Sequence, residues 1–189
     1  METPVKVKKI NRAAFYSKVR QSVFNGKLVQ SVVDGFETIF NELENRGISD
    51  NRWTAYILGT TYHESGHTMQ PVAEFGKGKG RKYGVADPET GKVYYGRGFS
   101  QITWKTNYEK FSKLLGVDLV NNPDLALDCK IATDILFEGM TRGIFTGKKL
   151  SDYFSDVKED WINARRIING TDCAELIADY SKNFYVALI

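Results

Sequence analysis

The sequence contains few of the residues that build cross-linked or metal-stabilised folds: two cysteines, two histidines and four prolines among 189 residues. The cysteines, Cys129 and Cys173, are too few for a disulfide framework or a four-thiolate zinc site, and we expect both to be small buried side chains. No apolar run reaches the roughly 18 residues that a membrane-spanning helix needs, and no internal repeat is present. We therefore expect neither membrane insertion nor a repeat array.

The composition is typical of a globular domain, with 42% hydrophobic and 26% charged residues. A chain of this length buries roughly 70% of the surface of its unfolded form, so it can fold without cross-links. We expect one domain over residues 1–189, in which residues 1–48 form helices packed on the same core. The net charge of +3 is a mild excess that suits an anionic polymer, whether nucleic acid or cell wall.

Hydrophobic periodicity predicts a mainly α-helical fold with a small β component. Asn11, and either Ser49 or Asp50, precede predicted helices as N-caps. Between residues 66 and 98, eight glycines interrupt any helix, and the turn sequence at 87–91 predicts a small β-hairpin that joins residues 82–83 to 93–95. The predicted helices lie at residues 12–24, 29–43, 51–64, 104–115, 128–144, 150–154, 161–168 and 172–188.

Glu64 stands out at the end of the third predicted helix. Because this helix is apolar on nearly all sides, Glu64 should lie among apolar side chains, and it lies at the negative end of the helix dipole. Both conditions disfavour a negative charge, and a carboxyl group that stays protonated can act as a general acid. The alternative is that Glu64 simply ends the helix in solvent.

The only two histidines flank this glutamate in the order His63-Glu64-x-x-His67, which is the H-E-x-x-H pattern of zinc proteases. In such a site both histidines bind zinc and the glutamate acts as a base on a metal-bound water. Gly66 weakens the helical turn that both ligands need, and no second helix offers a marked third ligand. A zinc protease is therefore the less favoured alternative, and we expect no metal and no other cofactor.

Several segments resemble glycoside hydrolase family 19. Residues 94–104, Tyr-Tyr-Gly-Arg-Gly-Phe-Ser-Gln-Ile-Thr-Trp, resemble the family's Tyr-Gly-Arg-Gly-x-x-Gln-Leu-Thr/Ser segment, and residues 63–66 resemble its His-Glu-Thr/Ser-Gly. Shorter matches follow in the same order at 107–108, 116–125 and 167–170, so the resemblance covers residues 50–185. The family includes plant and bacterial chitinases and phage endolysins, all with a lysozyme-like, mainly helical α+β fold. This sequence looks most like the compact endolysin type.

The resemblance implies catalytic roles for the matching residues. Glu64 corresponds to the general acid that protonates the glycosidic oxygen. Because the family inverts, a second carboxylate must activate a water on the opposite face of the sugar, with the carboxyl groups roughly 6.5–9.5 Å apart. Glu74 is the best candidate for this base and Glu89, in the predicted turn, is the runner-up. Thr103 corresponds to the hydroxyl residue that helps hold the water, although it could also cap the following helix. His67 departs from the family pattern, which has a second glycine there.

The same resemblance implies a set of substrate-binding residues. Gln101, Asn107 and Asn169 match residues that bind sugar hydroxyl and acetamido groups, for which side-chain amides have both donors and acceptors. Tyr95 and Arg97 complete the expected set. We expect Arg97 to buttress the cleft and to pair with a carboxylate.

We therefore expect an inverting glycosidase that cleaves β-1,4 bonds in peptidoglycan, as a monomeric lytic endolysin of a phage with no nucleic-acid partner. Chitin is the alternative substrate for the same mechanism, and a non-catalytic wall-binding module is a further alternative. Residues 1–19 carry five basic residues and no apolar core suited to a secretory signal. We accordingly expect the chain to be made in the cytoplasm and released by another route to act on the wall.

Overall fold

The structure, a computed structural model, describes residues 9–189; the first eight residues, including Lys6 and Lys8 of the basic N-terminal segment, lie outside the described part. Within it the α-helices are α1 (Arg12–Ser22), α2 (Gln30–Asn45), α3 (Asn51–Glu64), α4 (Lys105–Leu115), α5 (Cys129–Arg142) and α6 (Ala174–Leu188). Short 3-10 helices are η1 (Lys82–Gly84), η2 (Pro123–Leu127), η3 (Leu150–Asp152) and η4 (Asn163–Ile167). The strands are β1 (Val72–Ala73), β2 (Arg97–Gly98), β3 (Phe154–Ser155) and β4 (Lys158–Glu159). The expected mainly helical fold is confirmed.

Local sequence signals account for most helix ends. Asn11 and Asp50 accept hydrogen bonds from backbone N–H groups in the first turns of α1 and α3, so both predicted N-caps are formed. Gly116 and Gly143 end α4 and α5 in the left-handed conformation that glycine adopts without steric cost. The predicted helices at 150–154 and 161–168 are the short η3 and η4 rather than α-helices.

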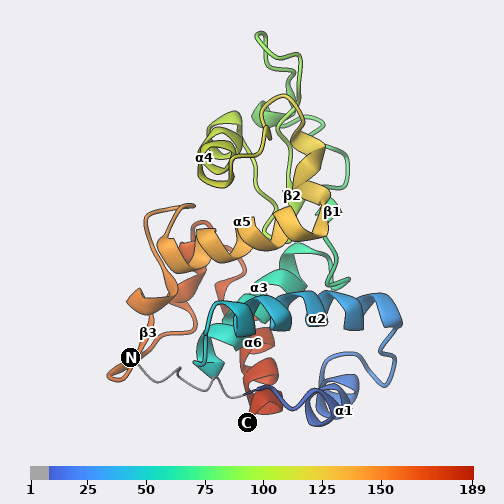
Figure 1. Cartoon of the computed structure of the whole chain (residues 1–189), viewed down its shortest axis with the longest axis vertical. Coiled ribbons are helices and arrows are strands. Elements are labelled where there is room, and N and C mark those ends of the chain that lie inside the picture. Colours follow the sequence, from blue (N-terminus) through green and yellow to red (C-terminus); the bar gives the residue numbers. More distant parts are fainter. Residues whose placement is uncertain (1–8) are drawn as a thin grey trace, which may run out of the picture.

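The larger hydrophobic core lies where α1, α2, α3 and α6 meet, at one end of the molecule (Figure 1). Phe15 of α1 packs edge-on against Phe36 of α2, with ring centroids 5.2 Å apart, and also contacts Phe184 of α6. The helices at 12–45 therefore share their core with α3 and α6. Within this core α3 and α6 pack so closely that a Cβ at Gly59 would lie 2.1 Å from the Ser181 hydroxyl oxygen.

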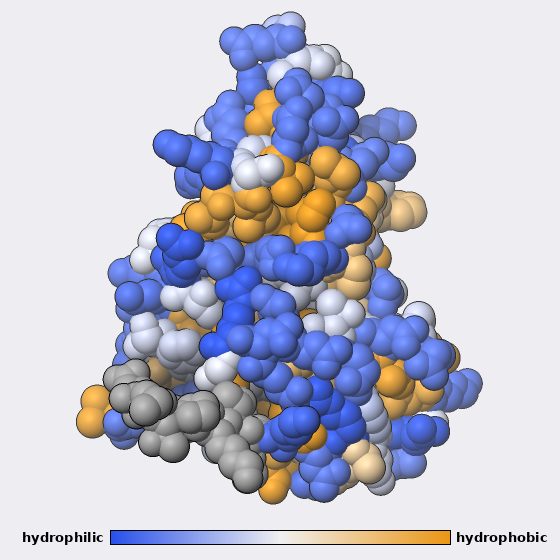
Figure 2. Space-filling view, in the orientation of Figure 1, coloured by the Kyte–Doolittle hydropathy of each residue, from blue (hydrophilic) through white to orange (hydrophobic). Residues whose placement is uncertain are grey.

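A second hydrophobic cluster lies at the other end of the molecule, around α4 and η2, and includes Tyr108 and Phe111 (Figure 1). α5 runs between the two ends and contributes to both clusters, through Leu136 on one side and Ile135 on the other. Most of the face in Figure 2 is hydrophilic, with a hydrophobic patch near the height of α5. No helix within residues 9–189 is both long enough and apolar enough to cross a bilayer.

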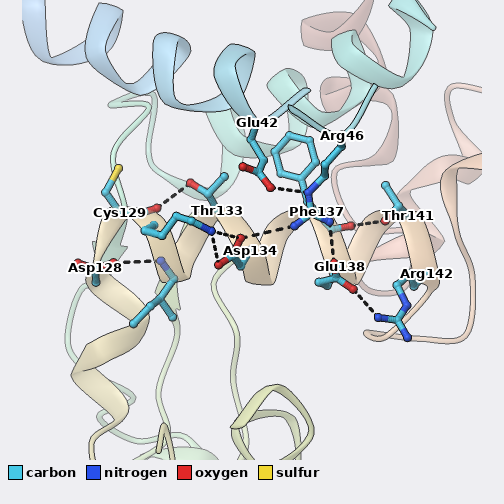
Figure 3. Close-up of polar contacts among 12 residues, drawn as sticks. Glu42, Arg46, Asp128, Cys129, Thr133, Asp134, Phe137, Glu138, Thr141 and Arg142 are labelled. Atoms are coloured by element: carbon cyan, nitrogen blue, oxygen red, sulfur yellow. Dashed lines mark hydrogen bonds and ion pairs between the residues drawn. The ribbon is translucent and has the colours of Figure 1, made fainter. Parts of the chain in front are cut away.

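Ion pairs hold the C-terminal end of α2 against α5. Arg46 at the end of α2 donates to Glu138 at 2.6 Å and approaches Asp134 at 3.5 Å, and Arg142 pairs with Glu138 from one turn further along α5 (Figure 3). The Arg46 guanidinium also lies over the ring of Phe137.

The β-hairpin expected between residues 82–83 and 93–95 is not formed. Its turn is present, since the Asp87 side chain accepts from the backbone N–H groups of Glu89 and Thr90. Residues 82–84 instead form η1, while Tyr94 is buried in the second cluster and donates its hydroxyl to a carbonyl oxygen. The strand pairs that do form are β1 with β2, antiparallel, and β3 with β4.

The two cysteines are exposed, which contradicts the expectation that both are buried. Cys129 is the first residue of α5 and Cys173 is the N-cap of α6. At a helix start the side chain has few neighbours, and the small size of cysteine does not by itself bring it into the core.

Candidate active site

A polar cleft of about 450 Å³ gathers residues from the end of α3, the glycine-rich segment, the start of α4 and the region of η4. Its lining contains both proposed carboxylates and four of the polar residues expected around them, namely Glu64, Glu74, Gln101, Thr103, Asn107 and Asn169. Segments far apart in the sequence thus meet at one site, as the family resemblance implies.

Glu64, the last residue of α3, faces the cleft with its side chain only 14% exposed, and one carboxylate oxygen accepts a hydrogen bond from Arg165 Nη1 at 2.6 Å. Arg165 comes from η4 and is 4% exposed. Burial by itself would lower the pKa of Arg165, but the charge of Glu64 and the hydrogen bond between them raise it. The expected low exposure of Glu64 is found, but a guanidinium lies where apolar surroundings were expected.

Arg165 also contacts a second acid. Its Nε donates to the Asp172 backbone carbonyl at 3.1 Å, and its Nη2 lies 3.3 Å from the Asp172 carboxylate, which also lines the cleft. One guanidinium therefore contacts two carboxyl groups at the cleft.

Glu74 has a different environment. Tyr83 donates its hydroxyl to one carboxylate oxygen at 2.8 Å, and the backbone N–H of Gly96 donates to the other at 3.0 Å. Burial, followed by the hydrogen bond to Glu74, raises the pKa of Tyr83, which therefore stays a donor. The two donors fix the orientation of the carboxyl group, and each of its oxygens keeps a free lone pair that can accept from a water molecule. An oriented carboxylate within hydrogen-bond reach of a water is what a general base needs.

Glu89, the runner-up for the base, does not line this cleft. Its side chain is 79% exposed in the turn at 87–91 and pairs with Lys105. Of the two candidates, only Glu74 shares a cavity with Glu64.

The amide and hydroxyl residues are held by backbone carbonyls. Thr103 donates its hydroxyl to the carbonyl of Gln101 at 2.9 Å, which leaves its oxygen free to accept from water, and it does not cap α4, since the N-cap position belongs to Trp104. The Gln101 amide nitrogen donates to two carbonyls, and that of Asn107 donates to the Thr103 carbonyl at 2.8 Å. Asn169 is exposed at the edge of the cleft.

Tyr95 and Arg97 are not brought to this cleft. They line a second hollow, where the Arg97 guanidinium lies 3.5 Å from the centroid of the Tyr95 ring. Arg97 is 4% exposed and pairs with Asp124 at 2.7 Å, and it also hydrogen-bonds to the Tyr108 hydroxyl. Arg97 thus has the expected carboxylate partner, but in this structure it supports the fold next to the cleft.

The geometry that a zinc protease needs is not built by His63 and His67. α3 ends at Glu64, and His67 follows in a left-handed conformation with φ 71°. Its ring stacks on Tyr62 with centroids 4.2 Å apart and meets the hydroxyl of Tyr180, whereas His63 lines the cleft. The two histidines therefore do not share one helical face, and residues 9–189 contain no group of three or more potential ligands suited to a metal.

Sequence reasoning missed three residues of the site: Arg165, Asp172 and Tyr83. Arg165 lies four positions before Asn169, next to the segment 167–170 that resembles the family. Its closeness to this segment is the sequence signal that could have pointed to it. The sequence predicts Tyr83 in a strand of the hairpin, and this prediction gave no indication of its contact with Glu74.

Comparison with known proteins adds to this geometry. The sequence model described as chitinase class I, of glycoside hydrolase family 19, matches residues 49–142. Endochitinase A2 from Pisum sativum is 36% identical over an alignment of 110 residues. The alignment covers 50% of this chain and 32% of the pea protein. This chain thus spans about a third of the length of that relative.

Two solved structures share the fold at 18% sequence identity. A bacterial family 19 chitinase aligns with a TM-score of 0.58 over 96% of this chain and 95% of its own. Chitinase C from Streptomyces griseus aligns with a TM-score of 0.60 over 95% of this chain and 76% of its own. These two structures show the shared fold, and the match to the family model shows that the chain belongs to glycoside hydrolase family 19.

Proposed function

We propose that this chain is an inverting glycoside hydrolase that cleaves β-1,4 bonds between N-acetylated sugars. The observation that carries the proposal is the presence, in one polar cleft, of two carboxylates with unlike partners. Glu64 is bound to a guanidinium, while Glu74 accepts only neutral hydrogen bonds. Unlike surroundings are how enzymes assign acid and base roles to two carboxyl groups.

In the proposed reaction Glu64, in its protonated form, gives its proton to the glycosidic oxygen as the bond to the anomeric carbon breaks. Glu74 takes a proton from a water that Thr103 helps to hold, and the oxygen of this water attacks the anomeric carbon from the opposite face. The products are two sugar chains, with the new reducing end inverted. Arg165 pairs with the carboxylate that forms on Glu64 as its proton leaves, so the guanidinium stabilises charge that develops during the reaction.

Chitin is the substrate that the relatives support best, because the pea protein and both solved structures are named as chitinases. The comparisons therefore favour the chitin alternative over the peptidoglycan substrate expected from the sequence. Peptidoglycan also contains β-1,4-linked N-acetylated sugars. It stays a second candidate because the segment 75–82, between the cleft residues Glu74 and Tyr83, carries four exposed basic residues that form no ion pair within residues 9–189. A monomeric state, a phage origin and release from the cytoplasm to the cell wall stay predictions.

Substitution of each carboxylate tests the proposal on glycol chitin, with reducing ends as the readout. We expect Glu64→Gln and Glu74→Gln each to lower kcat/KM by about 10²–10⁴-fold, the usual contribution of an acid or base. Glu89→Gln is the matched control and should leave the rate unchanged. Activity of Glu64→Gln close to that of the parent would remove the acid from the mechanism. A non-catalytic binding module would instead bind the polymer equally well in all four proteins and hydrolyse it in none.

A further inference from the structure

The segment that follows Glu74 is unusually basic. Residues 75–82 read Phe-Gly-Lys-Gly-Lys-Gly-Arg-Lys and contain no acidic residue. Its four basic residues are Lys77, Lys79, Arg81 and Lys82. All four side chains are exposed, and none of them forms an ion pair with any residue in the described part of the chain. By contrast, Arg165, which lines the cleft, pairs with Glu64, and Arg97, which lines the second hollow, pairs with Asp124.

This basic loop begins and ends at the cleft. Glu74 precedes it and Tyr83 follows it; both line the cleft, and their side chains are joined by the 2.8 Å hydrogen bond. The Tyr83 ring also meets Trp104 of the cleft wall edge-on, with centroids 5.5 Å apart. The four cationic side chains are thus attached to a segment whose two ends form part of the wall that the substrate would contact.

The loop backbone is internally bonded. The N–H groups of Lys77, Lys79 and Arg81 each donate to the carbonyl three residues earlier, at 2.9–3.0 Å. Gly78 and Gly84 lie so close that a Cβ on Gly78 would come within 2.7 Å of the Gly84 Cα. The loop is a chain of successive turns closed at its base, so its side chains project away from a compact backbone.

These charges act only at short range. Solvent-exposed charges are largely screened beyond the Debye length, about 8 Å at physiological ionic strength, so the loop affects a polymer only where the polymer passes close to the cleft edge. Neutral chitin has no group that pairs with four cations. A strand of the same type that carries carboxylates, as peptidoglycan does on its stem peptides, offers charge-assisted hydrogen bonds to lysine and arginine.

We propose that the loop 75–82 is an anion-binding edge of the cleft that recognises the carboxylates of peptidoglycan bound for hydrolysis. The inference rests on the proposed function, since it assigns the substrate of that same cleft. Phe75 opens the loop fully exposed, so an aromatic surface stands beside the cations on the side of Glu74.

The test compares two polymers with one backbone, neutral glycol chitin and carboxymethyl-chitin, together with purified peptidoglycan. The loop variant is Lys77→Gln, Lys79→Gln, Arg81→Gln and Lys82→Gln in one chain. A control variant neutralises four other exposed basic residues, which form no ion pair with any residue in 9–189 and lie outside the cleft lining: Lys9, Arg20, Lys27 and Lys182. Each of the two variants thus loses four positive charges.

We expect the loop variant to lose about tenfold in kcat/KM on carboxymethyl-chitin and on peptidoglycan, through KM, with less than about twofold change on glycol chitin. The control variant should match the parent on all three polymers, and 0.5 M NaCl, in the range where the Debye length falls to about 4 Å, should remove most of the difference. Equal losses on glycol chitin and carboxymethyl-chitin would overturn the proposal, as would equal losses in both variants or no loss at all.

Failure of the proposed function gives a different result, namely no hydrolysis of any polymer by the parent chain. In that case affinity electrophoresis of the parent and the loop variant, through gels containing glycol chitin or carboxymethyl-chitin, still measures whether the loop favours binding of the carboxylated polymer. Loop-dependent binding to phosphatidylglycerol vesicles without preference for the carboxylated polymer would assign the loop to a membrane surface and overturn the proposal.

Discussion

The guanidinium of Arg165 lies 2.6 Å from the carboxylate of Glu64, and the pair joins residues 101 positions apart in the sequence. Both side chains are largely buried, and Arg165 reaches Asp172 as well. The proposed acid is therefore fixed at the end of α3 by a cation on another element.

Removal of this cation should destabilise the fold and slow the reaction. Arg165→Met leaves the Glu64 carboxylate buried without its partner, which costs about 3–5 kcal/mol when one member of a buried pair is removed. Urea denaturation measures this loss. The double variant Arg165→Met with Glu64→Gln should regain much of the stability, because no unpaired charge remains. Arg166→Met is the control, since Arg166 is exposed and forms no ion pair with residues 9–189. Equal stability of Arg165→Met and this control would contradict the account.

The hydrogen bond between Tyr83 and Glu74 should be visible in the rate of hydrolysis. Tyr83→Phe removes one of the two donors that hold the Glu74 carboxylate in place. A hydrogen bond to a charged group contributes about 1.5–3 kcal/mol, so we expect kcat/KM to fall by about 10–100-fold. Tyr180→Phe removes a hydroxyl that contacts His67 and should leave kcat/KM unchanged. Equal rates for Tyr83→Phe and the parent would argue against Glu74 as the base.

The close packing of α3 on α6 should tolerate no side chain at Gly59. A Cβ there would meet the backbone of Ser181 at 2.9 Å as well as its hydroxyl, so rotation of the serine does not relieve the contact. We expect Gly59→Ala to cost about 1–3 kcal/mol and to lower the Tm by about 3–10 °C in a thermal scan. Gly170→Ala is matched, since nothing lies within 4 Å of its added Cβ, and it should change the Tm little. The same Tm for both variants would contradict this packing.

The ion pairs between α2 and α5 should make stability depend on acidity (Figure 3). Burial alone would raise the pKa of Glu138, but its hydrogen bonds to Arg46 and Arg142 lower it below the ordinary value of 4.5. A lowered pKa gives stability that is fully present above that value and is lost as the pH falls through the folded-state pKa. Glu138→Gln should therefore be about 1 kcal/mol less stable at pH 7, and the difference should shrink as the pH falls below 4.5 and disappear below the folded-state pKa. Glu109→Gln is the control, since Glu109 is exposed and forms no ion pair with residues 9–189. A difference between Glu138→Gln and the parent that persists at low pH would be inconsistent with the pairing.

The parts of the fold that depend on residues close together in the sequence could be predicted from the sequence. The ends of α3 follow from the Asp50 cap and from Gly66, and both are local signals. The β1–β2 pair could not be foreseen, because two-residue strands 25 positions apart have no periodicity of their own. Arg165 was missed for a similar reason, since only tertiary packing brings η4 to the end of α3.

The interpretation of Glu64 shows the same limit. Its position on a buried helix was predicted from apolar spacing, and the low exposure was found. The expectation of purely apolar surroundings was wrong, because helical periodicity describes the helix itself and not the residue that packs on it. The motif resemblance assigned Gln101, Thr103, Asn107 and Tyr95 to the substrate site. The first three line the cleft, whereas Tyr95 lines the second hollow.

The most direct test of the account is the anomeric form of the first products, followed by ¹H NMR during the opening minutes of hydrolysis of an N-acetylglucosamine hexamer. With Glu64 as acid and Glu74 as base on an opposing water, the new reducing ends appear as the α-anomer and only later equilibrate with the β-anomer. Initial formation of the β-anomer would mean that a residue of the chain or the substrate itself displaces the leaving group, and it would contradict the assignment of Glu74 as the base.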